Sequence, residues 1–199
     1  MSRQVKLIAA GALCLLVLAI ETLMPSPWLD SAMQIGFGAV CVWGLRASGW
    51  MAGVGEFTDL GSPSLVGLAR IAPALVLLQM WMGTALRYGA MGPATHVLGA
   101  MAVGAYLLYY STGVMAGAPT GHAARTGAVW LLGLVGAQVM LGIAALVVKY
   151  AQGGTTLLPE TPLFSRLHVA SGTMLLGMTA GMLELLRHSA RKPEAQTIA

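Results

Sequence analysis

Hydrophobic residues along this chain gather in six long continuous runs and do not alternate with polar residues. The runs cover residues 7–24, 32–52, 69–88, 95–116, 126–149 and 166–187. Each is close to the length of about 20 residues that a helix needs to cross the roughly 30 Å hydrocarbon core of a bilayer. Backbone polar groups in that core must form hydrogen bonds within the protein, as they do in helices and in closed barrels. Barrel strands alternate apolar and polar residues, so continuous apolar runs predict helices. The pattern predicts an all-α integral membrane protein with about six transmembrane helices.

The composition agrees with a chain that faces lipid. Of the 199 residues, 57% are hydrophobic and 9% are charged, whereas a soluble domain carries about 25% charged residues. So few polar groups cannot cover a water-facing surface, which excludes a soluble protein. The net charge of +4 therefore reports topology and does not indicate nucleic acid as a partner. Cys14 and Cys41 lie inside apolar runs and form neither a disulfide framework nor a metal-binding motif.

The two N-terminal runs have alternative interpretations. Arg3 and Lys6 precede the first run, as they would in a signal peptide, but no small-x-small cleavage site follows and Pro25 and Pro27 come instead. A retained helix is the better interpretation. Arg46 interrupts the second run, and its side chain must reach toward the interface if that run spans the membrane.

Basic residues are distributed unevenly between the two predicted sides. With the N-terminus in the cytoplasm, three fall outside, namely Arg87, Lys149 and Arg166. The others fall inside: Arg3, Lys6, Arg46, Arg70, Arg125, Arg187, Arg191 and Lys192. Because positively charged loops stay in the cytoplasm, this asymmetry predicts a multi-pass protein of the inner (plasma) membrane with both termini in the cytoplasm.

The chain is expected to have three parts, of which the middle one contains an internal repeat. Residues 1–68 would form two helices and a cytoplasmic loop, residues 69–188 an antiparallel four-helix bundle, and residues 189–199 a cytoplasmic tail. Each half of the middle part has a helix with Gln-x-x-x-Gly, an outer turn, and a helix that begins with His-Val. The matched pairs are Gln79 with Gln138, Gly83 with Gly142, and His96 with His168. Repeats of this kind place a shared site at their interface.

Helical spacing gives these residues a common face. Gln79, Gly83 and Arg87 are four residues apart and share one face of a helix. The corresponding face in the second unit carries Gln138, Gly142 and Lys149. The glycines allow a helix or a flat ligand to approach closely. Small residues also follow each histidine by one turn, which leaves room for a planar macrocycle; these are Gly99, Ala100, Ser171 and Gly172.

The topology predicts that the two histidines meet. Both of their helices run from outside to inside, so His96 and His168 lie at one depth near the outer surface. Two facing imidazoles in a bundle are typical ligands of a single heme b, whose iron takes one nitrogen from each side. Three cations at that level, Arg87, Lys149 and Arg166, would pair with the heme propionates.

Simpler interpretations stand beside this one. Each histidine could bond a loop carbonyl, the cations could reach toward water, and Gln79 and Gln138 could join neighbouring helices as polar contacts. His122 and His188 lie at the cytoplasmic end, where a second heme is an alternative to solvated interface residues. The solvated interpretation fits better, because His122 follows a loop with Pro119 and Gly121 and His188 precedes a basic tail.

At these residues the chain resembles one half of the heme A synthase family of cytochrome oxidase assembly. The likeness covers residues 69–188 and follows the order Gln79, Gly83, Arg87, His96, Gln138, Gly142 and His168. It implies a bacterial membrane protein with His96 and His168 as the axial ligands, and oxidation of the heme O methyl group to a formyl group. It also implies that half-length members pair as dimers.

Two departures leave the enzymatic activity open. The family's glutamate, three residues before its first bundle histidine, is replaced by Pro93, and Ser165 stands at the matching place before His168; the nearest outer acid is Glu160. The family's outer cysteine pair is also missing. Three functions follow: an oxidoreductase of heme A synthase type or an oxidase assembly protein, a heme b electron-transfer subunit of a larger respiratory or photosynthetic complex, and a heme-free scaffold. The expected partners are membrane lipid, a second copy or a larger membrane complex, and quinone.

Overall fold

The computed structural model describes residues 3–23, 26–151 and 163–193, and each of its six α-helices overlaps one of the predicted runs. Six α-helices occur in these residues: α1 (Arg3–Leu23), α2 (Pro27–Ala47), α3 (Leu65–Arg87), α4 (Pro93–Gly117), α5 (Ala123–Ala151) and α6 (Leu163–Ser189). A 3-10 turn (Trp50–Gly53) and two short strands, β1 (Phe57–Thr58) and β2 (Ala190–Arg191), complete them. The prediction of an all-α protein is confirmed.

Four of these helices are long and apolar enough to cross a membrane. Within the described residues they are Leu65–Arg87, Pro93–Gly117, Ala123–Lys149 and Leu163–Ser189. In α1 only the shorter stretch Gln4–Val17 is comparably apolar, and α2 is not among the candidates. The chain therefore has the helices of a multi-pass membrane protein, with the strongest spans in its C-terminal two thirds.

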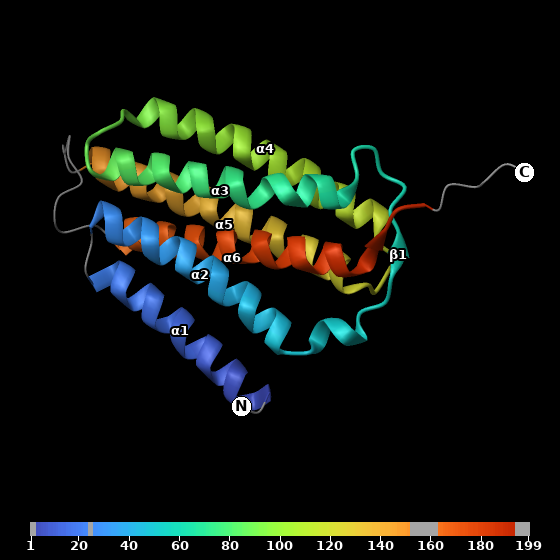
Figure 1. Ribbon diagram of the computed structural model, residues 1–199. Coiled ribbons are helices and arrows are strands. Elements are labelled where there is room, and N and C mark those ends of the chain that lie inside the picture. Colours follow the sequence, from blue (N-terminus) through green and yellow to red (C-terminus); the bar gives the residue numbers. More distant parts are fainter. Residues whose placement is uncertain (1–2, 24–25, 152–162, 194–199) are drawn as a thin grey trace, which may run out of the picture.

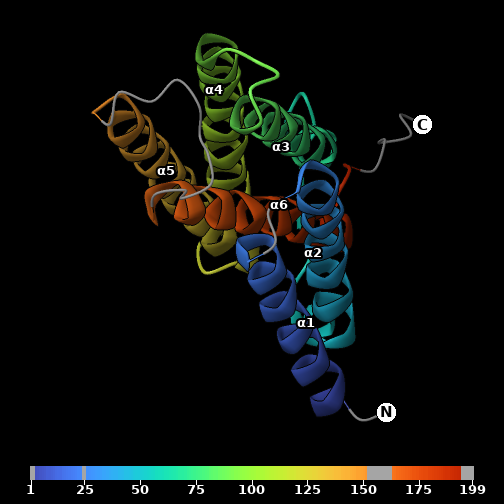
Figure 2. The same ribbon diagram turned by 90° about the vertical axis from the view of Figure 1, so that its left-hand side faces the viewer.

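Helices α3 to α6, which we call the four-helix unit, pack in a closed order. Each contacts the next in sequence, and α6 returns to contact α3. Successive helices run in opposite directions (Figure 1). The end where α4 and α6 begin is called the histidine end, and the end where α3 and α5 begin is called the tail end. In Figure 2, which views the histidine end, α4 and α5 stand apart near the viewer and converge toward the tail end.

The apolar core of the unit lies in its tail half. The largest fully buried side chains include Tyr110, Leu107, Leu131, Leu186 and Val76. In the first three turns of α6, at the histidine end, the buried residues are small or polar, namely Ser165, Ser171, Gly172 and Thr173. Tight packing of large side chains thus holds one half of the unit only.

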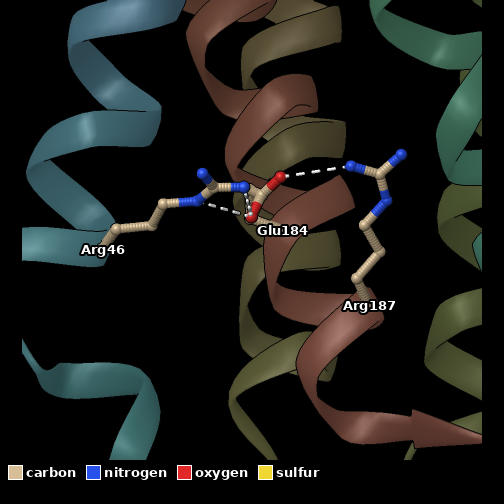
Figure 3. A network of polar contacts seen from close by, with 3 residues as sticks. All are labelled: Arg46, Glu184 and Arg187. Carbon is tan, nitrogen blue, oxygen red and sulfur yellow. Dashed lines mark hydrogen bonds and ion pairs between the residues drawn. The ribbon is translucent and has the colours of Figure 1, made fainter.

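Helices α1 and α2 attach to the unit through α6. A Cβ atom built on Gly177 of α6 would lie 2.8 Å from Cys41 and from Phe37 of α2, so the missing side chain allows this approach. In the last turn of α2, Arg46 donates to Glu184 of α6 through Nε (2.9 Å) and Nη2 (2.7 Å). Arg187 bonds the other oxygen of Glu184 at 3.3 Å (Figure 3). The charge that interrupts the second apolar run is therefore paired within the protein.

Polar caps explain why α3 begins four residues before its predicted run. The Ser64 hydroxyl accepts from the Gly67 amide at 3.1 Å, and the buried Asp59 carboxylate accepts from the Leu65 amide at 2.6 Å. Both bonds satisfy backbone donors that a helix start leaves unpaired. Next to this cap, β1 pairs in parallel with β2, which ties the loop before α3 to the end of α6.

Candidate functional site

His96 and His168 meet inside the histidine half of the four-helix unit. His96 is in the first turn of α4 and His168 is in the second turn of α6, and both are half-buried. Their ring centres are 6.3 Å apart, and the ring planes are nearly perpendicular at 88°. Two residues that are 72 positions apart in the sequence thus lie side by side on two helices that run in the same direction.

Each imidazole lies against the glycine of its own repeat unit. A Cβ atom on Gly83 would be 3.1 Å from Cε1 of His96, and one on Gly142 would be 2.9 Å from Cε1 of His168. Real side chains rarely come so close, so glycine is needed at both places if the rings are to keep their positions. The Gln-x-x-x-Gly pattern therefore makes room for the histidine that follows it.

Each glutamine also bonds the histidine of its own unit, although through different atoms. Gln79 Nε2 donates to the carbonyl oxygen of His96 at 2.8 Å and lies 3.0 Å from Nδ1 of the same ring. In the second unit, Nδ1 of His168 bonds the backbone oxygen of Gln138 at 3.1 Å. The Gln138 side chain is used separately and accepts from the hydroxyl of Ser171. Both Nδ1 atoms are thus engaged.

Glutamine side chains occupy the space beside Gly99 and Gly172, where the sequence predicted room for a macrocycle. A Cβ atom on Gly99 would meet Oε1 of Gln79 at 2.5 Å, and one on Gly172 would meet Nε2 of Gln138 at 3.0 Å. Glutamine side chains, and not an open slot for a macrocycle, fill these two places. The alternative prediction, that each glutamine makes a polar contact with a neighbouring helix, agrees with these hydrogen bonds.

The three predicted cations lie at the histidine end, in the terminal turns of their helices. Arg87 is in the last turn of α3, Lys149 is in the last turn of α5, and Arg166 follows the start of α6 by three residues. Arg87 lies over the ring of its neighbour Tyr88 at 5.9 Å, and Arg166 is exposed. Their predicted contact with propionates stays a prediction.

The distance between the two ring centres matches that of two imidazoles bound to one metal ion. Metal–imidazole nitrogen bonds are about 2 Å long, and the centre of a five-membered ring is about 1.1 Å from each ring atom. Two imidazoles on opposite sides of one ion would therefore have centres about 6 Å apart, close to the observed 6.3 Å. Among the described residues, neither Nε2 atom has a hydrogen-bond partner, while each Nδ1 is held by a glutamine. Metal-binding histidines usually donate their other ring N–H to a fixed acceptor, and the backbone oxygen of Gln138 is such an acceptor for His168.

The other two histidines have different surroundings at the tail end. Nε2 of His122 bonds the oxygen of Gly55 at 2.8 Å, and Nδ1 accepts from the amide of Ala124 at 3.1 Å. The ring also meets Phe57 edge-on at 5.0 Å. His122 therefore caps the start of α5 and bonds the loop before α3. The sequence pattern did not indicate either contact. His188 lies near Glu56 and is half-buried.

Acidic groups are scarce around the histidine pair. Pro93 begins α4 and Ser165 is buried in the first turn of α6, so neither supplies the carboxylate of the resembled family. Glu160 lies outside the described residues. Within the part of the chain that is described, no three of the residues His, Cys, Asp and Glu gather closely enough to hold a metal ion. The donors at this site are two imidazoles.

Comparison with protein-family models, with curated proteins and with solved structures finds no match for this chain.

Proposed function

We propose that this chain is a six-span membrane protein that holds one b-type heme between His96 and His168 and uses it to carry electrons. The observation that supports this most directly is the close approach of the two imidazoles, whose ring centres are 6.3 Å apart. In this proposal the four-helix unit is an antiparallel bundle, and α1 and α2 are two further spans that pack beside α6.

The protein groups would have three tasks. His96 and His168 would bind through Nε2, and Gly83 and Gly142 let the rings lie against the neighbouring helices. The side chain of Gln79 and the backbone oxygen of Gln138 hold the two Nδ1 atoms. A heme with an imidazole on each side supplies one-electron exchange and offers no open position on its iron. That property favours an electron carrier over an oxygenase.

The orientation in the membrane follows from the distribution of charge. We place the histidine end at the outer surface of a bacterial inner membrane and both termini in the cytoplasm, because eight of the 11 basic residues then lie inside. Arg87, Lys149 and Arg166 lie where the carboxylates of the macrocycle would meet water, and they would pair with them. A quinol in the membrane and an acceptor at the outer surface are the expected redox partners.

Optical spectra of the full-length protein, purified in detergent, test the ligand assignment. The reduced-minus-oxidised spectrum should be of the b type, and it should be lost in His96→Ala and in His168→Ala. His122→Ala is the matched control, because both nitrogens of that ring are already bonded at the tail end. Heme retained in both of the first two variants would falsify the proposal.

A second candidate is the oxidation of heme O in the manner of heme A synthase. The repeated order of Gln, Gly and His favours it, and the lack of a carboxylate at Pro93 and Ser165 speaks against it. Porphyrins extracted after incubation of the purified protein with heme O, molecular oxygen as the oxidant and a reducing system decide between the two. Formation of heme A with this protein as the sole catalyst would establish the enzyme.

A further inference from the structure

The two histidines have different hydrogen-bond partners on Nδ1, although they occupy equivalent places in the repeat. His168 faces the backbone oxygen of Gln138 at 3.1 Å. A carbonyl only accepts, so the Nδ1 atom of His168 carries the proton and Nε2 keeps its lone pair. His168 therefore already has the form that binds a metal through Nε2.

His96 is in the opposite state because of Gln79. The end of the Gln79 amide approaches two groups at once, the carbonyl oxygen of His96 at 2.8 Å and Nδ1 of its ring at 3.0 Å. The atom facing the carbonyl must be the NH2 nitrogen, since a second oxygen there would be repelled. Its two hydrogens serve both acceptors, so Nδ1 of His96 accepts and the neutral ring carries its proton on Nε2.

The other end of the same amide supports this assignment. Among the described residues, Oε1 of Gln79 is buried and has no hydrogen-bond partner. It lies against the backbone of Gly99, where a Cβ atom would be only 2.5 Å away. A buried acceptor left unpaired carries a free-energy cost. A second orientation of the amide that gave Oε1 a hydrogen-bond donor would remove this cost.

We infer that Gln79 is a positioning residue that keeps the proton of His96 on Nε2 while the cofactor is absent and turns its amide when His96 binds iron. This rests on the proposed ligation by the two histidines. On binding, one proton leaves Nε2 and one is taken up at Nδ1, so the ring stays neutral. The amide then also moves away from the His96 carbonyl and gives up that bond, so that Oε1 accepts from the new Nδ1–H without facing the carbonyl oxygen. His168 needs no such rearrangement.

The repeat supplies a matched control at Gln138. Its side chain bonds Ser171 and not the ring, and the acceptor for His168 is a backbone atom that a substitution keeps. Gln79→Met and Gln138→Met are changes of equal size at equivalent places. Only Gln79→Met is expected to change which ring nitrogen of a histidine carries the proton.

The first measurement uses the cofactor-free, full-length protein labelled with ¹⁵N-histidine. Nitrogen NMR at a pH of about 8, above the ordinary histidine pKa of about 6.5, reports which ring nitrogen carries the proton. The signals of His96 are assigned by their loss in His96→Ala. Wild-type protein should show the proton of His96 on Nε2 and that of His168 on Nδ1. In Gln79→Met the ratio of the two forms of His96 should shift about fivefold toward Nδ1–H, the value of one ordinary hydrogen bond.

The second measurement uses the heme-loaded protein. Gln79→Met should bind ferric heme about 10-fold more weakly and should have a higher midpoint potential, because Nδ1–H of His96 has lost its acceptor. Gln138→Met should stay within about twofold of wild type. Equal effects of the two substitutions would overturn the inference, as would a wild-type His96 with its proton on Nδ1, which needs no variant to detect. If no heme binds at all, the proposed function fails, while the NMR result still decides the role of Gln79.

Discussion

The two halves of the four-helix unit are built on different physical principles. In the tail half, large apolar side chains such as Tyr110 and Leu107 are fully buried. In the first three turns of α6, at the histidine end, the buried residues are small or polar, and neighbouring helices are joined by hydrogen bonds in which Gln79 donates and Gln138 accepts. Close packing stabilises a fold, whereas polar groups and missing side chains create a place for a ligand.

This difference means that the residues that stabilise the fold and the residues of the candidate site lie in different parts of the same helices. Each helix contributes its tail-side half to the core and its other half to the candidate site. Substitutions in the tail half should therefore cost unfolding free energy, and substitutions in the histidine half should cost cofactor binding. Four predictions, taken from the largest expected effect to the smallest, test that separation.

Leu107→Ala should be the most destabilising change. Its side chain is 1% exposed, whereas that of its neighbour Leu108 is 53% exposed and available to lipid. Lipid is as apolar as the core, so the loss is mainly that of packing, about 1–3 kcal/mol for the cavity. Unfolding in mixed detergent micelles gives the free energy, and Leu108→Ala is the control. Equal losses for the two variants would contradict a packed tail half.

Gly142→Ala should lower heme occupancy about 10-fold with little loss of stability. The new Cβ would lie 2.9 Å from the His168 ring and would displace it. Gly136→Ala in the same helix is the control, because nothing lies within 4 Å of that position. Pyridine hemochrome assays on equal amounts of purified protein give the occupancy. A Gly142→Ala variant that keeps full occupancy would show that the ring position is not critical.

Arg46→Gln should weaken the attachment of α2 by less than about 1 kcal/mol. Arg46 is mostly exposed, and such pairs contribute little. Glu184 keeps Arg187 as a partner in the variant. Arg70→Gln, an exposed arginine on α3, is the control. The free energy of unfolding is the quantity to measure. If Arg46→Gln lowers it by well over about 1 kcal/mol and by more than the control does, the ion pair is a main attachment of the N-terminal helices.

The smallest effect is expected from Glu56→Gln, and it should depend on pH. A hydrogen bond from the exposed Arg191, with the charge of that residue and of His188, lowers the pKa of Glu56 below its ordinary value. A lowered pKa means that the pair stabilises the fold at neutral pH and loses this contribution as the pH falls through the pKa of Glu56. Unfolding of wild type and variant should therefore differ slightly at pH 7, and the difference should disappear as the pH falls below the pKa of Glu56. A difference that grows in acid would contradict the pairing.

The helices and the histidine pair were predictable from the sequence because their signals are local. Continuous apolar runs place six helices within a few residues, and the alternating direction of helices brings His96 and His168 to one end. The repeated Gln-x-x-x-Gly spacing also marked the helix faces that meet those histidines.

Other contacts were not predictable, because they join residues through tertiary packing. The pairing of Arg46 with Glu184 spans 138 positions, and neither residue has a spacing that marks the other. The contacts of His122 with Gly55 and Ala124 depend on how the loop before α3 folds back. The filling of the space beside Gly99 by Gln79 depends on side-chain conformation, on which the pattern of residue types is silent.

The central claim is that two imidazoles share one iron, and electron paramagnetic resonance of the oxidised, purified protein tests it most directly. The account predicts a low-spin ferric signal equivalent to one heme per chain. Because the ring planes are nearly perpendicular at 88°, that signal should be strongly anisotropic. A high-spin signal, or a protein that binds no iron when supplied with heme, would contradict the account.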